Sequence, residues 1–302
     1  MQWIVATLFA SMLFSIVNFI DKYLIEARVK DYRGMIVYTS LVGFLFGSAW
    51  FVFSGFPVLS KKDTVIVLFT GVLMVWHMAL YFKTLSLETV SNIILFFEVT
   101  PVFVLIFAFL FLGERLDISQ MIGFFLVFFA VVAASLRKNG KTKKHCWLSV
   151  SFLYILLASL FVATAATLIK FTVQENSFSS ILCYESWGVG IGGLLLFLMS
   201  SSAREAFVEN FRTVGKKVVM VIFVNEAIFV LARVLLLYAY SIGPLALVSV
   251  LSGVNIFFGI LFGLILAFFA PTIFQEKNVP VEVLKKVTLG GIALFGIWLI
   301  QN

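Results

Sequence analysis

Ionisable side chains within long apolar stretches are the residues whose types and positions could do chemistry in this chain. Glu98 lies in such a stretch, directly before Thr100-Pro101. An ionisable group at the centre of a membrane span costs at least ~2.5 kcal/mol, so such groups often mark solute or proton sites. Pro101 removes a backbone donor and frees a carbonyl, and we predict a hinge there. Glu98 is therefore a candidate substrate or proton site; the alternative is a structural hydrogen bond to a neighbouring helix.

A second apolar stretch, residues 218–240, carries Glu226 and Arg233. Seven residues are about two helical turns, so both side chains are predicted to share one helix face. A guanidinium can bind a carboxylate in bidentate fashion, which makes Arg233 a candidate for an anionic group of a solute. The alternative is an internal ion pair with Glu98 or Glu185. Arg233 could also alternate between the solute and the internal ion pair during a transport cycle.

His77 and Tyr81 lie one helical turn apart in another apolar stretch. Imidazole titrates near neutral pH and can relay protons, although most buried histidines only donate a hydrogen bond. No residue at helical spacing beside His77 supplies a cluster of metal ligands, so neither a metal nor another cofactor is predicted. The remaining candidate substrate-binding residues are polar side chains in other apolar stretches: Asn18, Tyr38, Glu185, Asn225 and Asn255.

Composition predicts that lipid surrounds much of this chain. Hydrophobic residues make up 62% of the 302 and charged residues only 12%, with a mean hydropathy of +1.11. A soluble domain carries roughly 25% charged residues. A spanning helix needs about 20 apolar residues, and the short alternating segments of a membrane barrel do not occur. We therefore predict an all-α integral membrane protein of the cell membrane with ten spans: 3–20, 35–54, 64–82, 90–112, 118–136, 148–169, 179–200, 218–240, 244–268 and 287–300.

The distribution of basic residues predicts the orientation. Of the 22 lysines and arginines, seventeen fall in odd-numbered connections between spans and four in even-numbered ones. Basic loops stay in the cytoplasm, so we expect cytoplasmic odd connections and external termini. This pattern accounts for the net charge of +7 without nucleic acid. The expected partners are the lipid bilayer and a small solute; the oligomeric state is not determined, and a monomer is compatible with the sequence.

A charged linker, RKNGKTKK at residues 137–144, divides the predicted spans five and five. The domain organisation is therefore a first five-helix repeat at 1–137, a basic linker at 138–147 and a second repeat at 148–302. Halves with an odd number of spans insert in opposite orientations, which predicts inverted repeats. Four short matches support the division: residues 15–22 with 163–170, Tyr38 with Tyr184, Gly43-x-x-x-Gly47 with Gly188-x-x-x-Gly192, and residues 85–90 with 240–245.

Three short motifs occur in the stretch at residues 81–135: Thr100-Pro101, Gly113-Glu114-Arg115 and Ile122-Gly123. With these motifs the stretch resembles the repeat of EamA-type members of the drug/metabolite transporter superfamily. Gly113 is expected to end the fourth span before Glu114. The second half departs most from the pattern, since residues 274–277 read Phe-Gln-Glu-Lys and the ninth span lacks the proline.

The resemblance implies a secondary transporter that moves a small organic metabolite by alternating access. Solute gradients, exchange or protons would drive it. We expect a central cavity lined mainly by spans one, three, four, six, eight and nine. The mixed charges of the candidate residues favour a zwitterion such as an amino acid. The resemblance allows amino acids, amines and nucleotide-like metabolites.

Enzymatic motifs are absent from the sequence: it has no phosphate-binding glycine loop, His-Glu-x-x-His, Cys-x-x-Cys or Gly-x-Ser-x-Gly. We therefore do not expect an enzyme. Two alternatives stay open. One is a membrane-embedded enzyme that uses glutamate and histidine as acid and base, and the other is a non-transporting membrane partner protein.

Overall fold

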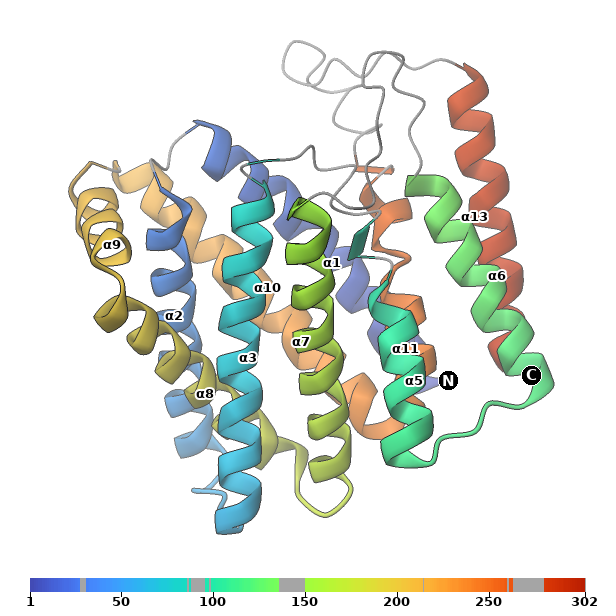
Figure 1. Ribbon diagram of the computed structural model, residues 1–302, viewed down its shortest axis with the longest axis horizontal. Helices are drawn as coiled ribbons and strands as arrows, with labels where there is room; N and C mark the ends of the chain where they lie inside the picture. The colour runs from blue at the N-terminus through green and yellow to red at the C-terminus, as the bar shows by residue number, and fades with distance from the viewer. Residues whose placement is uncertain are drawn as a thin grey trace.

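A computed structural model describes residues 1–27, 31–85, 87, 96–97, 99–135, 150–213, 215–259, 261–262 and 280–301. Within these ranges the chain consists of α-helices joined by short turns and loops, without a strand (Figure 1). The prediction of an all-α protein is confirmed for this part of the chain.

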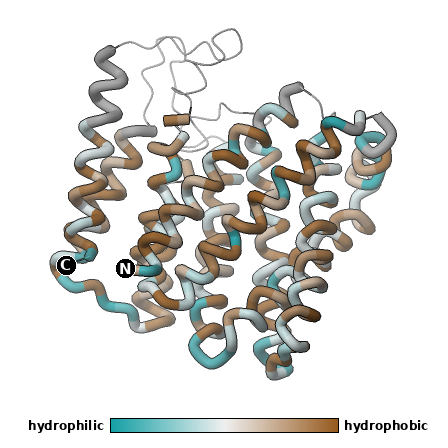
Figure 2. Tube along the Cα trace, turned by 180° about the vertical axis from the view of Figure 1, so that it is seen from behind, coloured by the Kyte–Doolittle hydropathy of each residue, from teal (hydrophilic) through white to brown (hydrophobic). Residues whose placement is uncertain are grey.

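Six described helices are long and apolar enough to cross a membrane: α1 (Gln2–Ala27), α2 (Tyr32–Phe53), α3 (Lys61–Leu85), α7 (Val150–Val173), α8 (Phe178–Met199) and α10 (Lys216–Ile242). The helices in the remaining predicted spans are α5 (Thr100–Leu112), α6 (Ile118–Ser135), α11 (Leu245–Ser252) and α13 (Pro280–Gln301), whose apolar segments are shorter. Apolar residues dominate along these helices (Figure 2). The chain is thus a multi-pass membrane protein, as its composition predicted.

Glycines bring α3 and α8 into backbone contact. A Cβ added at Gly188 would meet the backbone of Leu68, and one added at Gly71 would meet the backbones of Glu185 and Val189. Small residues let membrane helices approach closely, and this approach supplies van der Waals packing where lipid removes the hydrophobic driving force. The close α3–α8 contact fixes Glu185 beside the interior of the bundle.

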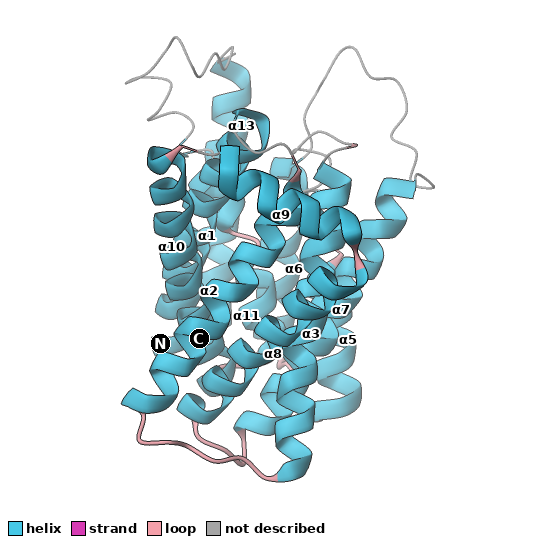
Figure 3. Cartoon of the chain, turned by 90° about the vertical axis from the view of Figure 1, so that its left-hand side faces the viewer, coloured by secondary structure: helices cyan, strands magenta, loops and turns pink. Residues whose placement is uncertain are grey.

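A short helix that the hydropathy of the sequence did not predict, α9 (Ser201–Thr213), follows α8 and crosses beside α2 at one end of the bundle (Figure 3). Ala203, Ala206 and Asn210 are buried and share one face of α9, at the spacing of an amphipathic helix. The Asn210 amide donates to the carbonyl of Asp31 at 3.1 Å. The other face of α9 is polar, so the mean hydropathy of this helix is too low to predict a membrane span.

The loop between α5 and α6 lies at the lower end of the molecule in the view of Figure 1 and contacts α11 of the second predicted half. Gly113 ends α5 in the left-handed conformation, with φ of 66°, as its motif predicted. The next residue, Glu114, accepts hydrogen bonds from the backbone N–H of Leu245 at 3.0 and 2.9 Å. A carboxylate at a helix N-terminus satisfies free N–H groups and favours the helix dipole. Glu114 therefore caps α11 as well as following the end of α5.

Candidate functional site

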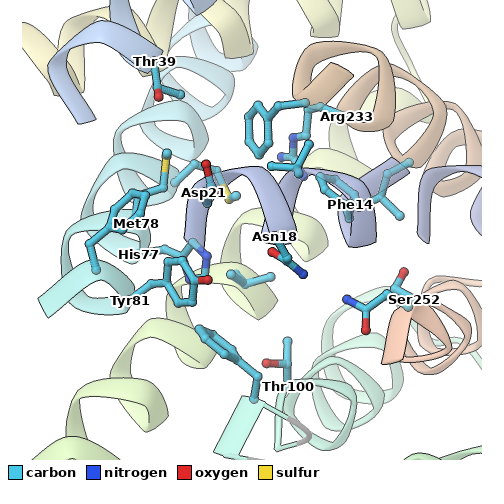
Figure 4. Close-up of a pocket in the computed structure, with 18 of the residues that line it drawn as sticks. Phe14, Asn18, Asp21, Thr39, His77, Met78, Tyr81, Thr100, Arg233 and Ser252 are labelled. Carbon is cyan, nitrogen blue, oxygen red and sulfur yellow. The ribbon is translucent and has the colours of Figure 1, made fainter. Parts of the chain in front are cut away.

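A cavity of about 320 Å³ lies inside the bundle. This volume is at the lower end of the range for small-molecule sites, about 300–1,000 Å³. Its walls come from α1, α3, α5, α7, α10 and α11, which occupy the spans expected to line it, and also from α2. Most of the lining is apolar, and the polar side chains gather between α1, α3 and α10 (Figure 4).

The structure brings most of the predicted site residues to this cavity. Glu185 lies just behind it, in a smaller adjoining pocket that Arg233 and Glu226 also line. Glu98 lies outside the described residues. The residues from the predicted set that line the cavity are Asn18, His77, Tyr81, Pro101, Asn225, Glu226, Arg233 and Asn255.

Tyr38 does not line the cavity. Its ring packs against Phe207 of α9, with the ring centroids 4.5 Å apart. The prediction of Tyr38 as a site residue could not allow for α9, which supplies an aromatic partner on the opposite side of α2. In the structure Tyr38 is a packing residue.

Arg233 is paired with Glu185. Its Nε and one terminal nitrogen lie 3.2 and 2.6 Å from Glu185 Oε1. The Glu185 side chain is only 3% exposed and that of Arg233 13%. Of the two predicted arrangements for Arg233, the structure therefore contains the internal ion pair, so the guanidinium charge is already balanced.

Asp21 is a cavity residue that the sequence reasoning missed. The first span is predicted to end at residue 20, directly before Asp21, whereas α1 continues to Ala27. The three-residue spacing from Asn18 was an available signal, since residues three apart share a helix face. Asn225 Nδ2 donates to Asp21 Oδ1 at 2.7 Å, which joins α1 to α10.

Thr39 is a second missed residue. Its hydroxyl donates to Glu226 Oε1 at 2.6 Å, and Glu226 is 4% exposed. This bond joins α2 to α10 beside the Asp21–Asn225 bond. A hydroxyl inside a span carries little signal in hydropathy, because threonine also bonds within helices.

His77 and Tyr81 lie on the wall opposite α10. Their rings are nearly parallel, at 8° with centroids 6.4 Å apart, and Phe97 meets His77 edge-on at 5.4 Å. His77 Nδ1 has no hydrogen-bond partner within the described residues. An unpartnered ring nitrogen beside a cavity is available to a ligand or to a water molecule.

Pro101 lies in the first turn of α5, and Thr100 Oγ1 donates to Ser159 Oγ of α7 at 2.9 Å. A proline in a first turn leaves no intrahelical donor missing. The hinge at Pro101 stays a prediction. The described side chains contain no group of three or more potential ligands that could hold a metal ion.

Comparisons with known proteins agree with this architecture. Residues 1–136 match the model of the EamA-like transporter family. A solved structure described only as "Crystal structure of protein" has a TM-score of 0.73, with 14% identity over 99% of this chain and 98% of that one. At this identity the likeness shows a shared fold. A comparison with curated proteins gave no match.

Proposed function

Because residues 1–136 match the model of the EamA-like transporter family, which is part of the drug/metabolite transporter superfamily, we propose that this chain is a secondary transporter of a small organic solute. The observation that carries the proposal is the 320 Å³ cavity, in which acidic, basic and aromatic side chains face one another deep within a bundle of apolar helices. Ionisable groups are costly there and are retained where they serve transport.

The proposed architecture is ten spans in two inverted five-helix repeats, 1–137 and 148–302, in the cell membrane. The sequence matches between the halves and the charged linker support it. The cavity supports it too, since its walls come from helices of both halves. In inverted-repeat transporters the solute site lies at the interface between the repeats.

Alternating access requires the cavity to open to each side in turn. Asp21 and Tyr81 lie near the C-terminal ends of α1 and α3, whereas two hydrogen-bonded contacts lie at the opposite end of the bundle. There Lys170 Nζ donates to the carbonyl of Gly243 at 2.9 Å, and Glu114 caps α11 across the halves. The proposed cycle breaks these contacts when the cavity opens to that side, which is external by the distribution of basic loops.

The proposed solute is an amino acid, a similar zwitterion or an amine, moved by exchange or by a proton gradient. Arg233 reaches a solute carboxylate only if it leaves Glu185. An amine meets the unpaired carboxyls of the described lining directly, and Glu98 and His77 are the proposed proton carriers.

A thermal-shift screen of the purified protein against pools of amino acids and amines tests whether the cavity binds such solutes. A ligand that binds only the folded state at 100 times its Kd stabilises by about 2.7 kcal/mol. We expect stabilisation of the wild type, and none in Val162→Trp, which fills the cavity wall on α7. Leu157→Trp is the matched control, because Leu157 is 40% exposed on the outer side of the same helix. Equal stabilisation of both variants would place the solute site elsewhere.

A further inference from the structure

Three hydrogen-bond acceptors lie together where α1 meets α10: the carboxyl of Asp21, the side-chain carbonyl of Asn225 and the carboxyl of Glu226. All three residues line the cavity. Asn225 donates through Nδ2 to Asp21 Oδ1 at 2.7 Å. Only the nitrogen of an amide can donate to a carboxylate, so this contact fixes the orientation of the Asn225 amide.

The Oδ1 atom of Asn225 differs from the other acceptors because it is buried without a hydrogen-bond partner among the described residues. Asn225 is 1% exposed, and its Oδ1 has no hydrogen-bond partner within the described part of the chain. A buried polar atom without a partner costs about 1–3 kcal/mol, and each such atom in a native structure calls for an explanation. A donor supplied by a ligand would satisfy it.

The two carboxyls beside this atom favour a cationic donor over a neutral one. Thr39 supplies one hydrogen bond to Glu226 and Asn225 supplies one to Asp21. Among the described side chains, no lysine or arginine lies within ion-pair distance of either carboxyl, and Arg233 is held by Glu185 at 2.6 Å. A buried carboxylate is stable when it is paired with an opposite charge.

Aromatic rings lie next to the acceptors. Phe14 and Phe229 meet edge-on with centroids 5.9 Å apart, and both line the cavity with Tyr81 and Phe97. Aromatic faces attract cations and pack against apolar bodies. The cavity therefore offers hydrogen-bond acceptors beside aromatic rings.

We propose that Asp21, Asn225 and Glu226 form a subsite for the ammonium group of an organic amine, whose apolar body lies against Phe14, Phe229 and Tyr81. An ammonium has three N–H donors, and the subsite has three acceptor groups. The proposal rests on the proposed transport function and narrows its solute class from zwitterions and amines to amines.

Binding to the purified wild type tests the subsite without relying on variants. The probes are 2-phenylethylamine, its N-acetyl derivative, which lacks the charge, and 3-phenylpropionate, which carries a negative charge. Calorimetry is expected to give at least about tenfold tighter binding of the amine than of either analogue, since charge-assisted hydrogen bonds stabilise by about 1.5–3 kcal/mol. Equal or tighter binding of an analogue, or no binding of the amine, overturns the subsite.

Variants then test whether the Asp21 and Glu226 carboxyls bind the ammonium group. Asp21→Asn and Glu226→Gln are each expected to weaken amine binding about ten- to a hundredfold while the N-acetyl derivative binds as before. Asp63→Asn is the matched control, because Asp63 is a buried carboxyl that bonds Ser60 and Asn176 away from the cavity. Wild-type amine affinity in both cavity variants overturns the assignment.

Measuring solute flux in proteoliposomes distinguishes failure of the amine subsite from failure of the proposed transport function. Amine binding with the expected selectivity but no flux of any solute in proteoliposomes contradicts transport and leaves the subsite standing. Flux of zwitterions with no preference for the amine contradicts the subsite and leaves transport standing.

Discussion

Replacing Arg233 by methionine is expected to destabilise the folded protein by about 3–5 kcal/mol, the range found when one partner of a buried ion pair is removed. Methionine keeps much of the length and apolar contact of the arginine but leaves the Glu185 carboxylate without its partner. That carboxylate belongs to a side chain that is 3% exposed, where an unpaired charge is costly. Thermal unfolding of the purified variant in detergent measures the effect.

The double variant Arg233→Met with Glu185→Gln is the control for this prediction. It removes both charges, so we expect it to recover most of the lost stability, as neutral replacements of buried ion pairs do. If Arg233 instead serves only to bind a solute, the single variant unfolds at the wild-type temperature. That result, or a double variant no more stable than the single one, contradicts the structural ion pair.

Replacing Gly188 by valine is expected to destabilise the bundle by about 3 kcal/mol, at the upper end for overpacking, or to prevent its assembly. The added Cβ would meet the backbone of Leu68, which cannot turn aside as a flexible side chain can. Helices α3 and α8 would have to separate, and the backbone contact at Gly71 would be lost with them. Yield of monodisperse protein and its unfolding temperature measure the effect.

Gly291 provides the matched control, because a Cβ added at this glycine of α13 meets no described residue within 4 Å. Gly291→Val introduces the same side chain into another apolar helix and is expected to change stability little. Equal losses in the two variants would mean that valine acts through helix propensity, and the close α3–α8 packing would not be the cause.

The membrane helices could be predicted because a long apolar run indicates a segment surrounded by lipid, where the backbone must be helical. The same reasoning passed over α9, because a helix that packs one face on α2 and leaves the other polar has no long apolar run. Tyr38 packs against Phe207 of α9, so its packing role could not be predicted without α9. Local motifs gave the end of α5 at Gly113, but not that Glu114 caps a helix of the other half, since a motif carries no information about distant partners.

The candidate site could be predicted as a set of residue types, and its pairings could not. The buried charges Glu226 and Arg233 were expected on one face, and both line the cavity. Which carboxyl meets Arg233 depends on the packing of α8 against α3, which the sequence does not report. Asp21 was missed because the apolar run that predicts the first span ends at residue 20, yet α1 continues to Ala27.

Counterflow into proteoliposomes tests the central claim, that solute crosses the membrane through this cavity. Vesicles preloaded with unlabelled 2-phenylethylamine and amino acids are diluted into the labelled compounds in slightly acidic buffer, where the amine crosses lipid slowly. The account predicts transient accumulation of label by the wild type and by Leu157→Trp, and no accumulation above protein-free vesicles by Val162→Trp. Accumulation by Val162→Trp at the wild-type rate, or none by the wild type, would contradict it.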